Sequence, residues 1–382
     1  MNKWILLILS LLLLSACEKD EPVPYVHISE RTVLVWLAGD NNLYSEVPHK
    51  LSALAEGFRN AAPSDCRLLV YADRRGNYPQ LIEIMPDGNQ AVLETYPAQN
   101  SASPETFSRF LNYMMETAPA RHYGLILFSH ATGWLPQGGL ENPSLEEKPL
   151  SRTVFDDNGE QMTLAELADA LPADVRFDYI VFENCFMGGA EVAYALRDKA
   201  DRLLVSSAEI LSPGFEEIYS SSLYRLFAPT PDLSGFAADY YNYRNAKSGN
   251  HRSATVSVIN TSAMPHLASL TSDIISGTSI DGIGSLDEEK MKTMQRFNRH
   301  DYTLFFDLEE YLCELAPGRA TEIRTAISEA VEYASATADF MPTYDHGFHI
   351  ARHCGLTVYI PQSRFPALNT AYTETAWYRA TR

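Results

Sequence analysis

Apolar runs of strand length recur through the first half of this chain, and each of them ends in polar residues or glycine. The clearest runs are 33–38, 68–73, 123–129, 178–182 and 202–205. A run that is apolar at nearly every position is typical of a parallel strand that is covered on both faces. Helical spacing separates several of them, as at 45–59 and 104–117. The pattern predicts an α/β fold with a mostly parallel central sheet and helices on both faces.

The second half of the chain departs from this regular alternation. Helical patterns dominate beyond residue 225, and two further strands are expected at 254–259 and 356–360. We predict helices at 233–246, 263–276, 288–297, 306–316 and 319–338. We therefore divide the folded chain into a core at 31–224 and a more helical C-terminal α/β part at 225–382 that packs on this core.

The N-terminal residues have the pattern of an export signal. Lys3 precedes an apolar stretch at 4–14, which is too short to span a bilayer comfortably. The tetrad Leu14-Ser15-Ala16-Cys17 resembles a bacterial lipobox, which implies a signal peptide at 1–16 and a lipidated tether at 17–30 that begins at Cys17. The alternative is a chance cysteine near an ordinary cleavage site.

The charged residues that follow the lipobox bear on where the protein would reside. Glu18-Lys19-Asp20-Glu21 resembles the acidic export tag of surface lipoproteins, and a solvated linker is the other interpretation. We expect an exported lipoprotein of the outer membrane that contacts the membrane through its N-terminal lipid, at the cell surface if the tag functions. The net charge of −19 argues against a nucleic-acid partner, because binding phosphate needs a basic face.

Neither the cysteines nor the histidines form a strong metal pattern. The cysteines after residue 17 are spaced too widely for a zinc site and are Cys66, Cys185, Cys313 and Cys354. His346, His349 and His353 lack a neighbouring acidic motif, and Asp156-Asp157-Asn158-Gly159 does not complete a calcium-binding loop. We predict no metal site and no required cofactor.

Two of the apolar runs deliver reactive side chains to the same expected edge of the sheet. One run ends at His130, and another ends in Glu183-Asn184-Cys185 before two glycines and a helical pattern. Ligands bind at the carboxyl ends of parallel strands, and a nearby imidazole helps to populate a thiolate. We predict Cys185 as a nucleophile and His130 as its proton-transfer partner. The backbone N–H groups of Ala131 and Cys185 are the natural donors to an oxyanion.

The residues around these two strand ends resemble a known family. Residues 125–134, 182–188 and 191–194 resemble the clostripain-like cysteine peptidases, which are relatives of caspases, gingipains and legumains. The similarity extends to 306–308 and 354–361, and so covers nearly the whole mature chain. By this resemblance His130 is the catalytic histidine and Cys185 the nucleophile. The histidine lies 55 residues before the cysteine, which is the caspase order and the reverse of the papain order.

The resemblance implies a caspase-like fold and a cysteine endopeptidase that acts on peptide or protein substrates. The namesake of the family responds to calcium, so the resemblance permits calcium as a cofactor, although no residue of this chain indicates a calcium site. The loop at 135–153 contains Lys148 and Arg152, where a peptidase specific for basic residues could cleave itself. An uncut surface loop is the alternative interpretation.

Three positions depart from the usual residues of the family. Ala131 replaces a glycine, and a positive φ there would cost stability. Asn184 replaces an alanine and would either crowd the site or find a hydrogen-bond partner. Glu183 replaces an aspartate that binds substrate arginine or lysine, and its alternative role is a structural ion pair with an arginine of this protein.

Two further acidic residues follow the predicted strand at 202–205. Glu209 and Glu216 are candidates for a second acid of the substrate pocket, with solvated loop residues as the alternative. Because Ala131 and Asn184 depart from the family, the rival function is that of a catalytically inactive homologue that binds peptides at the surface.

Overall fold

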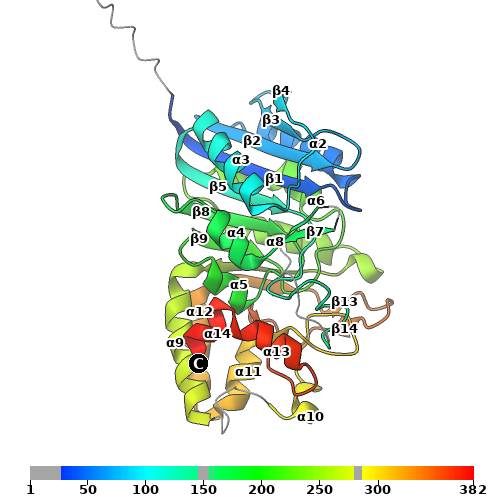
Figure 1. Cartoon of the computed structure of the whole chain (residues 1–382), viewed down its shortest axis with the longest axis vertical. Coiled ribbons are helices and arrows are strands. Elements are labelled where there is room, and N and C mark those ends of the chain that lie inside the picture. The colour runs from blue at the N-terminus through cyan, green and yellow to red at the C-terminus, as the bar shows by residue number, and fades with distance from the viewer. Residues whose placement is uncertain (1–26, 145–154, 158, 279–285) are drawn as a thin grey trace, which may run out of the picture.

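A nine-stranded sheet runs through the protein in the order β12-β10-β9-β8-β5-β1-β2-β3-β4 (Figure 1). The computed structural model describes residues 27–144, 155–157, 159–278 and 286–382. Cys17, Lys148 and Arg152 lie outside these residues, as do the segment predicted as a signal peptide and most of the predicted tether. The strands of the sheet are β1 (Ser29–Gly39), β2 (Cys66–Arg74), β3 (Gln80–Ile84), β4 (Gln90–Thr95), β5 (Ala120–Phe128), β8 (Phe177–Glu183), β9 (Ala200–Val205), β10 (Thr255–Asn260) and β12 (Val331–Ala336).

The middle of the sheet is parallel and its flanks are antiparallel. Strands β2, β1, β5, β8 and β9 pair in parallel, whereas β3, β4, β10 and β12 pair antiparallel with their neighbours. This arrangement confirms the predicted α/β class with a mostly parallel central sheet. The strands β10 and β12 belong to the C-terminal part, so this part extends the same sheet past β9.

Helices cover both faces of the sheet, as the continuous apolar runs predict. In β1, Val33, Val35 and Leu37 pack in one apolar cluster with α2, α6 and α8, whereas Leu34 and Trp36 pack in another on the opposite face. All five side chains are buried. A strand that is buried on both faces cannot alternate apolar and polar residues, which explains the sequence pattern.

The helices have these bounds. On the first face they are α2 (Glu46–Ala61), α6 (Glu216–Ser222), α7 (Tyr224–Phe227) and α8 (Leu233–Asn245). The remainder are α3 (Pro104–Thr117), α4 (Leu164–Ala170), α5 (Ala190–Ala195), α9 (Met264–Thr278), α10 (Glu288–Met291), α11 (Leu308–Leu315), α12 (Ala320–Ala330), α13 (Pro366–Thr373) and α14 (Ala376–Thr381). Short two-stranded sheets pair β6 (Phe155–Asp157) with β7 (Glu160–Met162), β11 (Phe306–Asp307) with β15 (Thr357–Val358), and β13 (Asp339–Phe340) with β14 (Phe348–His349).

Local signals set two of the helix starts that the sequence predicts. At α3, the Ser103 hydroxyl accepts a hydrogen bond from the backbone N–H of Thr106, and Pro104 occupies the first turn. At α4, Thr163 and Glu166 form a reciprocal capping box. Both devices satisfy backbone N–H groups that have no partner inside the helix.

The C-terminal half contains the main errors of the predicted secondary structure. The helix predicted at 319–338 ends at Ala330, and the chain continues as β12, which pairs antiparallel with β10. The helix predicted at 288–297 ends at Met291. In both cases tertiary pairing and packing override a helical spacing of apolar residues. Within the described residues, no helix is long and apolar enough to cross a membrane.

Candidate active site

The parallel register of β5 and β8 brings His130 and Cys185 to the same edge of the sheet. The last paired residues are Phe128 and Glu183, and each reactive residue lies two positions further along its own chain segment. Both side chains are partly buried and line one cavity of about 540 Å³. The structure therefore brings together the two residues that the sequence singled out.

Asn184 ties the two reactive loops together. Its side chain is buried, and its Nδ2 donates a hydrogen bond of 2.9 Å to the backbone carbonyl of Ser129, the residue before His130. Of the two outcomes expected for this residue, the structure shows the hydrogen-bonded one. This hydrogen bond joins the segment that carries the imidazole to the segment that carries the thiol.

The backbone strain expected at Ala131 is not present in the structure. Positive φ angles occur instead at Gly133 (65°) and at Phe186 (60°), directly after the cysteine, and Ala131 is not among the residues with a positive φ. A Cβ atom on Gly133 would lie 2.6 Å from the carbonyl oxygen of Phe186. The glycine needed for close approach of the two loops is thus Gly133, and alanine at 131 is compatible with the fold.

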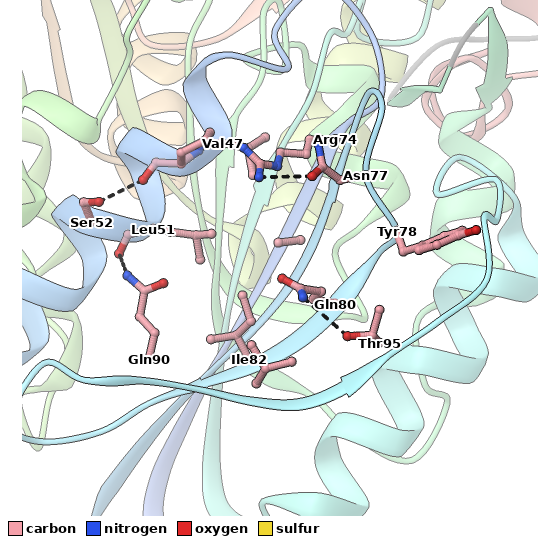
Figure 2. A pocket seen from close by; sticks show the side chains of 13 residues that line it. Val47, Leu51, Ser52, Arg74, Asn77, Tyr78, Gln80, Ile82, Gln90 and Thr95 are labelled. Atoms are coloured by element: carbon pink, nitrogen blue, oxygen red, sulfur yellow. Dashed lines mark hydrogen bonds between the residues drawn. The ribbon is translucent and has the colours of Figure 1, made fainter.

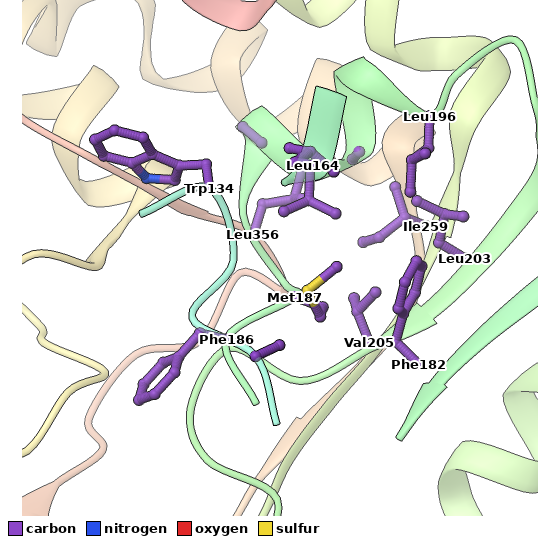
Figure 3. Packing of buried hydrophobic residues seen from close by; sticks show 14 of the residues in the cluster. Trp134, Leu164, Phe182, Phe186, Met187, Leu196, Leu203, Val205, Ile259 and Leu356 are labelled. Carbon is purple, nitrogen blue, oxygen red and sulfur yellow. The ribbon is translucent and has the colours of Figure 1, made fainter. Parts of the chain in front are cut away.

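The segment after Cys185 is anchored in the apolar core. Met187 is fully buried, and Figure 3 shows it among Phe182, Val205 and Leu356. The ring of Phe186 points in a different direction and stacks on Phe305, with ring centroids 4.8 Å apart. The backbone N–H of Phe186 donates a 3.0 Å hydrogen bond to the carbonyl of Ala208. These contacts restrict the position of the cysteine that precedes them.

The thiol of Cys185 is protonated at neutral pH in this state of the protein. Burial raises its pKa to about 12, and the carboxylate of Glu209 adds to this effect. The backbone N–H of Ile210, which lies 3.4 Å from Sγ, and the guanidinium of Arg299 act in the opposite direction. The thiol therefore needs a base to become a nucleophile.

His130 can serve as this base because its imidazole is neutral. Burial lowers its pKa, although the carboxylates of Asp156 and Glu46 act in the opposite direction. Its Nε2 contacts Oδ1 of Asn42, a residue that sequence reasoning missed. Asn42 follows the strand β1, so the strand-end rule that identified His130 could also have identified it.

Replacing Glu209 with glutamine is expected to accelerate alkylation of Cys185 by iodoacetamide at pH 8. The substitution removes a negative charge that raises the pKa of the thiol, so the thiolate fraction at this pH increases. The measurement is the alkylation rate of Cys185 by peptide mass spectrometry, with Glu216→Gln as the matched control. An unchanged rate would contradict the electrostatic role of Glu209.

Glu183 does not line the cavity, and its carboxylate is occupied within the protein. Its Oε1 accepts hydrogen bonds of 2.6 Å from Lys50 Nζ and from the backbone N–H of Phe215, and its Oε2 accepts one of 2.8 Å from the hydroxyl of Tyr219. The side chains of Glu183 and Lys50 are 1% and 0% exposed. The prediction that Glu183 contacts substrate is therefore corrected. Its alternative, a structural ion pair, describes the structure, with lysine in place of the expected arginine.

The other two acids differ in their relation to the cavity. Glu209 lines it, and its Oε1 lies 2.9 Å from Nε of Arg299, which lines it too. Glu216 begins α6 and is not among the lining residues. Burial raises the pKa of Glu216 and the positive charge of Lys50 acts in the opposite direction, so Glu216 belongs with the charged groups around Glu183. Arg299 is a second site residue that sequence reasoning missed, and unlike Asn42 it has no sequence signal, because it comes from an irregular segment far along the chain.

The weak metal motifs of the sequence fall into separate environments. His353 is partly buried and lies 3.0 Å from the Ser207 hydroxyl, whereas His349 lies 3.0 Å from Asp339 at the surface. Asp157 accepts a 2.9 Å hydrogen bond from Ser101, and Asp156 accepts one of 3.1 Å from Gln161. In the described part of the chain, no group of three or more histidine, cysteine or acidic residues has the geometry to hold a metal ion.

Comparisons with known proteins identify the family of this chain. The model of the clostripain family matches residues 35–339. Clostripain of Hathewaya histolytica is 25% identical over 217 residues, which cover 48% of this chain and 40% of that protein. The chain thus spans less than half of the length of this curated relative.

Solved structures extend the similarity to nearly the whole chain. An inactive zymogen C11 protease from Parabacteroides distasonis is 30% identical, with a TM-score of 0.80 and coverage of 94% of this chain and 99% of that one. A secreted C11 cysteine protease from Bacteroides thetaiotaomicron, in complex with an irreversible peptide inhibitor, is 26% identical, with a TM-score of 0.78 and coverage of 92% and 98%. The family match and these structural neighbours show that this chain belongs to the clostripain family of C11 cysteine proteases.

Proposed function

We propose that the protein is an active endopeptidase whose nucleophile is Cys185 and whose base is His130. The observation that carries this proposal is the strand register, which places both residues beside one cavity at the carboxyl edge of the sheet. The peptide inhibitor on the Bacteroides relative supports a peptide as the ligand class. Peptide or protein chains would thus be the substrates.

The proposed reaction needs only residues of this chain and water. The proton of the Cys185 thiol moves to His130 while sulfur bonds to the scissile carbonyl carbon, and the carbonyl oxygen becomes an oxyanion. Backbone N–H groups of Ala131 and Cys185 would bind this oxyanion. Collapse breaks the C–N bond, and the imidazolium gives its proton to the leaving amine. Water, deprotonated by His130, then hydrolyses the thioester and restores the thiol.

We further propose a preference for arginine or lysine before the scissile bond, with Glu209 as the acid that binds it. Glu209 directly precedes Ile210, whose N–H contacts the thiol, so its carboxylate lies beside the reacting centre. Its Oε2 is buried without a hydrogen-bond partner in the described structure. A buried carboxylate oxygen in this state is stabilised by a cationic ligand. Arg299 holds the other oxygen, so a substrate cation would share or displace this pairing.

A panel of fluorogenic peptides tests both parts of the proposal. The panel varies the residue before the scissile bond among arginine, lysine, glutamine, leucine and glutamate. We expect hydrolysis with a basic preference, and a Glu209→Gln variant should reduce kcat/KM for basic substrates by roughly 10- to 100-fold while changing neutral ones less, since a charge-assisted hydrogen bond contributes about 1.5–3 kcal/mol.

The panel also separates the two parts from each other. A neutral or acidic preference would refute the role of Glu209 but leave the endopeptidase assignment intact. If no peptide is cleaved although the panel peptides bind in the cavity, the inactive peptide-binding homologue becomes the correct description.

A further inference from the structure

Asn42 follows β1, and His130 follows β5, the strand that pairs with β1. The strands β1 and β5 pair in parallel up to Leu37 and Phe128, so the residues after both strands emerge at the same edge of the sheet. Asn42 and His130 line the same cavity as Cys185. The Oδ1 atom of Asn42 contacts Nε2 of His130.

The neighbouring residue fixes the backbone from which Asn42 extends. Asn41 is buried, and its Nδ2 donates hydrogen bonds of 3.2 Å to the carbonyl of Ala38 and 2.8 Å to that of Asp156. Its Oδ1 accepts a 2.8 Å hydrogen bond from the backbone N–H of Leu43. The turn is thus held on both sides of Asn42, and its side chain need not order the loop by itself.

From this arrangement we infer that Asn42 is a positioning residue that sets the tautomer of His130. The inference rests on the proposed peptidase function of the same site. An amide oxygen can only accept a hydrogen bond, so the Nε2 atom that faces it carries the proton. In a neutral imidazole the Nδ1 atom is then unprotonated, and it is the nitrogen that can receive the proton of the Cys185 thiol.

The bond has a second consequence after the proton has moved. The imidazolium carries a positive charge at Nε2–H, and the dipole of the Asn42 carbonyl stabilises this charge without adding a net charge. Other charged groups also surround His130. Asp156 and Glu46 raise its pKa, and the lining of the cavity adds Arg75, Glu141, Glu209, Arg299 and His300. Asn42 therefore acts mainly on the orientation and the tautomer of the His130 ring, whereas these charged groups act on its pKa.

The tautomer is measured directly by ¹⁵N NMR of the full chain with labelled histidine, using a His130→Gln variant to assign the signals. We expect the Nε2-protonated form in the wild-type protein at a pH where His130 is neutral. Asn42→Ala should give a mixture of tautomers. A wild-type Nδ1-protonated form, or an Asn42→Ala spectrum identical to that of the wild type, would overturn the inference.

Kinetics test the same inference by an independent route. Asn42→Ala should lower kcat by roughly 10- to 100-fold with little change in KM, because the imidazole loses its orientation but the substrate contacts remain. Asn42→Asp keeps the acceptor and adds a negative charge that favours the imidazolium. It should recover part of kcat and move the acidic limb of the pH profile to higher pH. A purely structural role would leave that limb in place.

The matched control is Asn77→Ala. Asn77 is also exposed and follows a strand at the same edge of the sheet, where its Oδ1 accepts a 3.2 Å hydrogen bond from Arg74 in a separate groove (Figure 2). We expect wild-type kinetics and a wild-type tautomer. A loss of kcat equal to that of Asn42→Ala would refute the specific role of Asn42. A wild-type protein that cleaves no peptide would contradict the proposed function, whereas the tautomer measurement still decides the inference.

Discussion

Replacing Cys185 with alanine is expected to lower kcat/KM for the best peptide of the panel by about 10⁴-fold or more. The sulfur is the protein atom that bonds to the substrate carbon in the proposed mechanism, and the residues around it cannot replace it. The side chain is small and lies at the cavity, so the fold should be retained. The measurement is steady-state hydrolysis at matched protein concentration, together with a thermal unfolding curve of the variant.

A second cysteine provides the control for this experiment. Cys313 is half-buried on α11, outside the cavity residues. Cys313→Ala should retain wild-type kcat/KM and should not affect labelling by a peptidyl electrophile, whereas Cys185→Ala should abolish that labelling. If Cys185→Ala keeps a rate within tenfold of the wild type, the nucleophile lies elsewhere.

Replacing Lys50 with methionine is expected to destabilise the protein by about 3–5 kcal/mol, because it leaves the buried carboxylate of Glu183 without its cation. Lys50 Nζ lies 2.6 Å from Glu183 and donates a 2.7 Å hydrogen bond to the carbonyl of Pro213. The ammonium also lies 4.3 Å from the centroid of the Phe128 ring. The measurement is the free energy of unfolding from urea denaturation, with the slope of the transition compared between variants.

Two further variants test the cause of this loss of unfolding free energy. Lys50→Met combined with Glu183→Gln removes both charges and should be more stable than Lys50→Met alone. Lys290→Ala breaks a 2.7 Å ion pair with Glu314 that is about 40% exposed, and it should cost only about 0–1 kcal/mol. A loss below about 1 kcal/mol for Lys50→Met would show that the pair is not a buried structural one.

The same variant also bears on substrate specificity. If Glu183 has only a structural role, Lys50→Met should leave the ratio of basic to neutral substrate cleavage unchanged at a temperature where the protein is folded. A higher ratio in this variant would show that the freed carboxylate of Glu183 reaches the substrate, which would contradict a purely structural role.

The predicted fold followed from short runs of consecutive apolar residues, which few kinds of local structure can bury. Val33, Leu34 and Val35 are consecutive apolar residues in a short run that ends at a glycine, and a strand covered on both faces buries all three. The location of His130 and Cys185 at one cavity was also predictable, because parallel strands end at one edge. The helical spacing at 331–338 was misleading, since whether this segment forms a helix or an edge strand depends on the open hydrogen-bonding edge of β10.

Ion pairs between residues that are remote in the chain could not be predicted from the sequence. Glu183 was predicted to contact substrate because its position along the chain, two residues before the thiol, suggests proximity to it. However, β8 ends at Glu183, so the period of two that would place residues i and i+2 on one face does not extend to Cys185, and the carboxylate of Glu183 meets Lys50 from α2. Arg299 reaches Glu209 from a segment 90 residues later, and no local pattern indicates such a contact.

The sequence by itself thus determined the α/β class and the meeting of His130 and Cys185 at one sheet edge, because strand burial and strand direction are local, periodic properties. Only the tertiary structure decided which polar groups face the cavity and which are neutralised inside the protein. Glu183 binds Lys50, Asn184 binds the Ser129 carbonyl, and Asn42 meets His130. These pairings depend on distances between segments that are remote in the chain, and a buried polar group takes whichever partner the completed packing brings within reach.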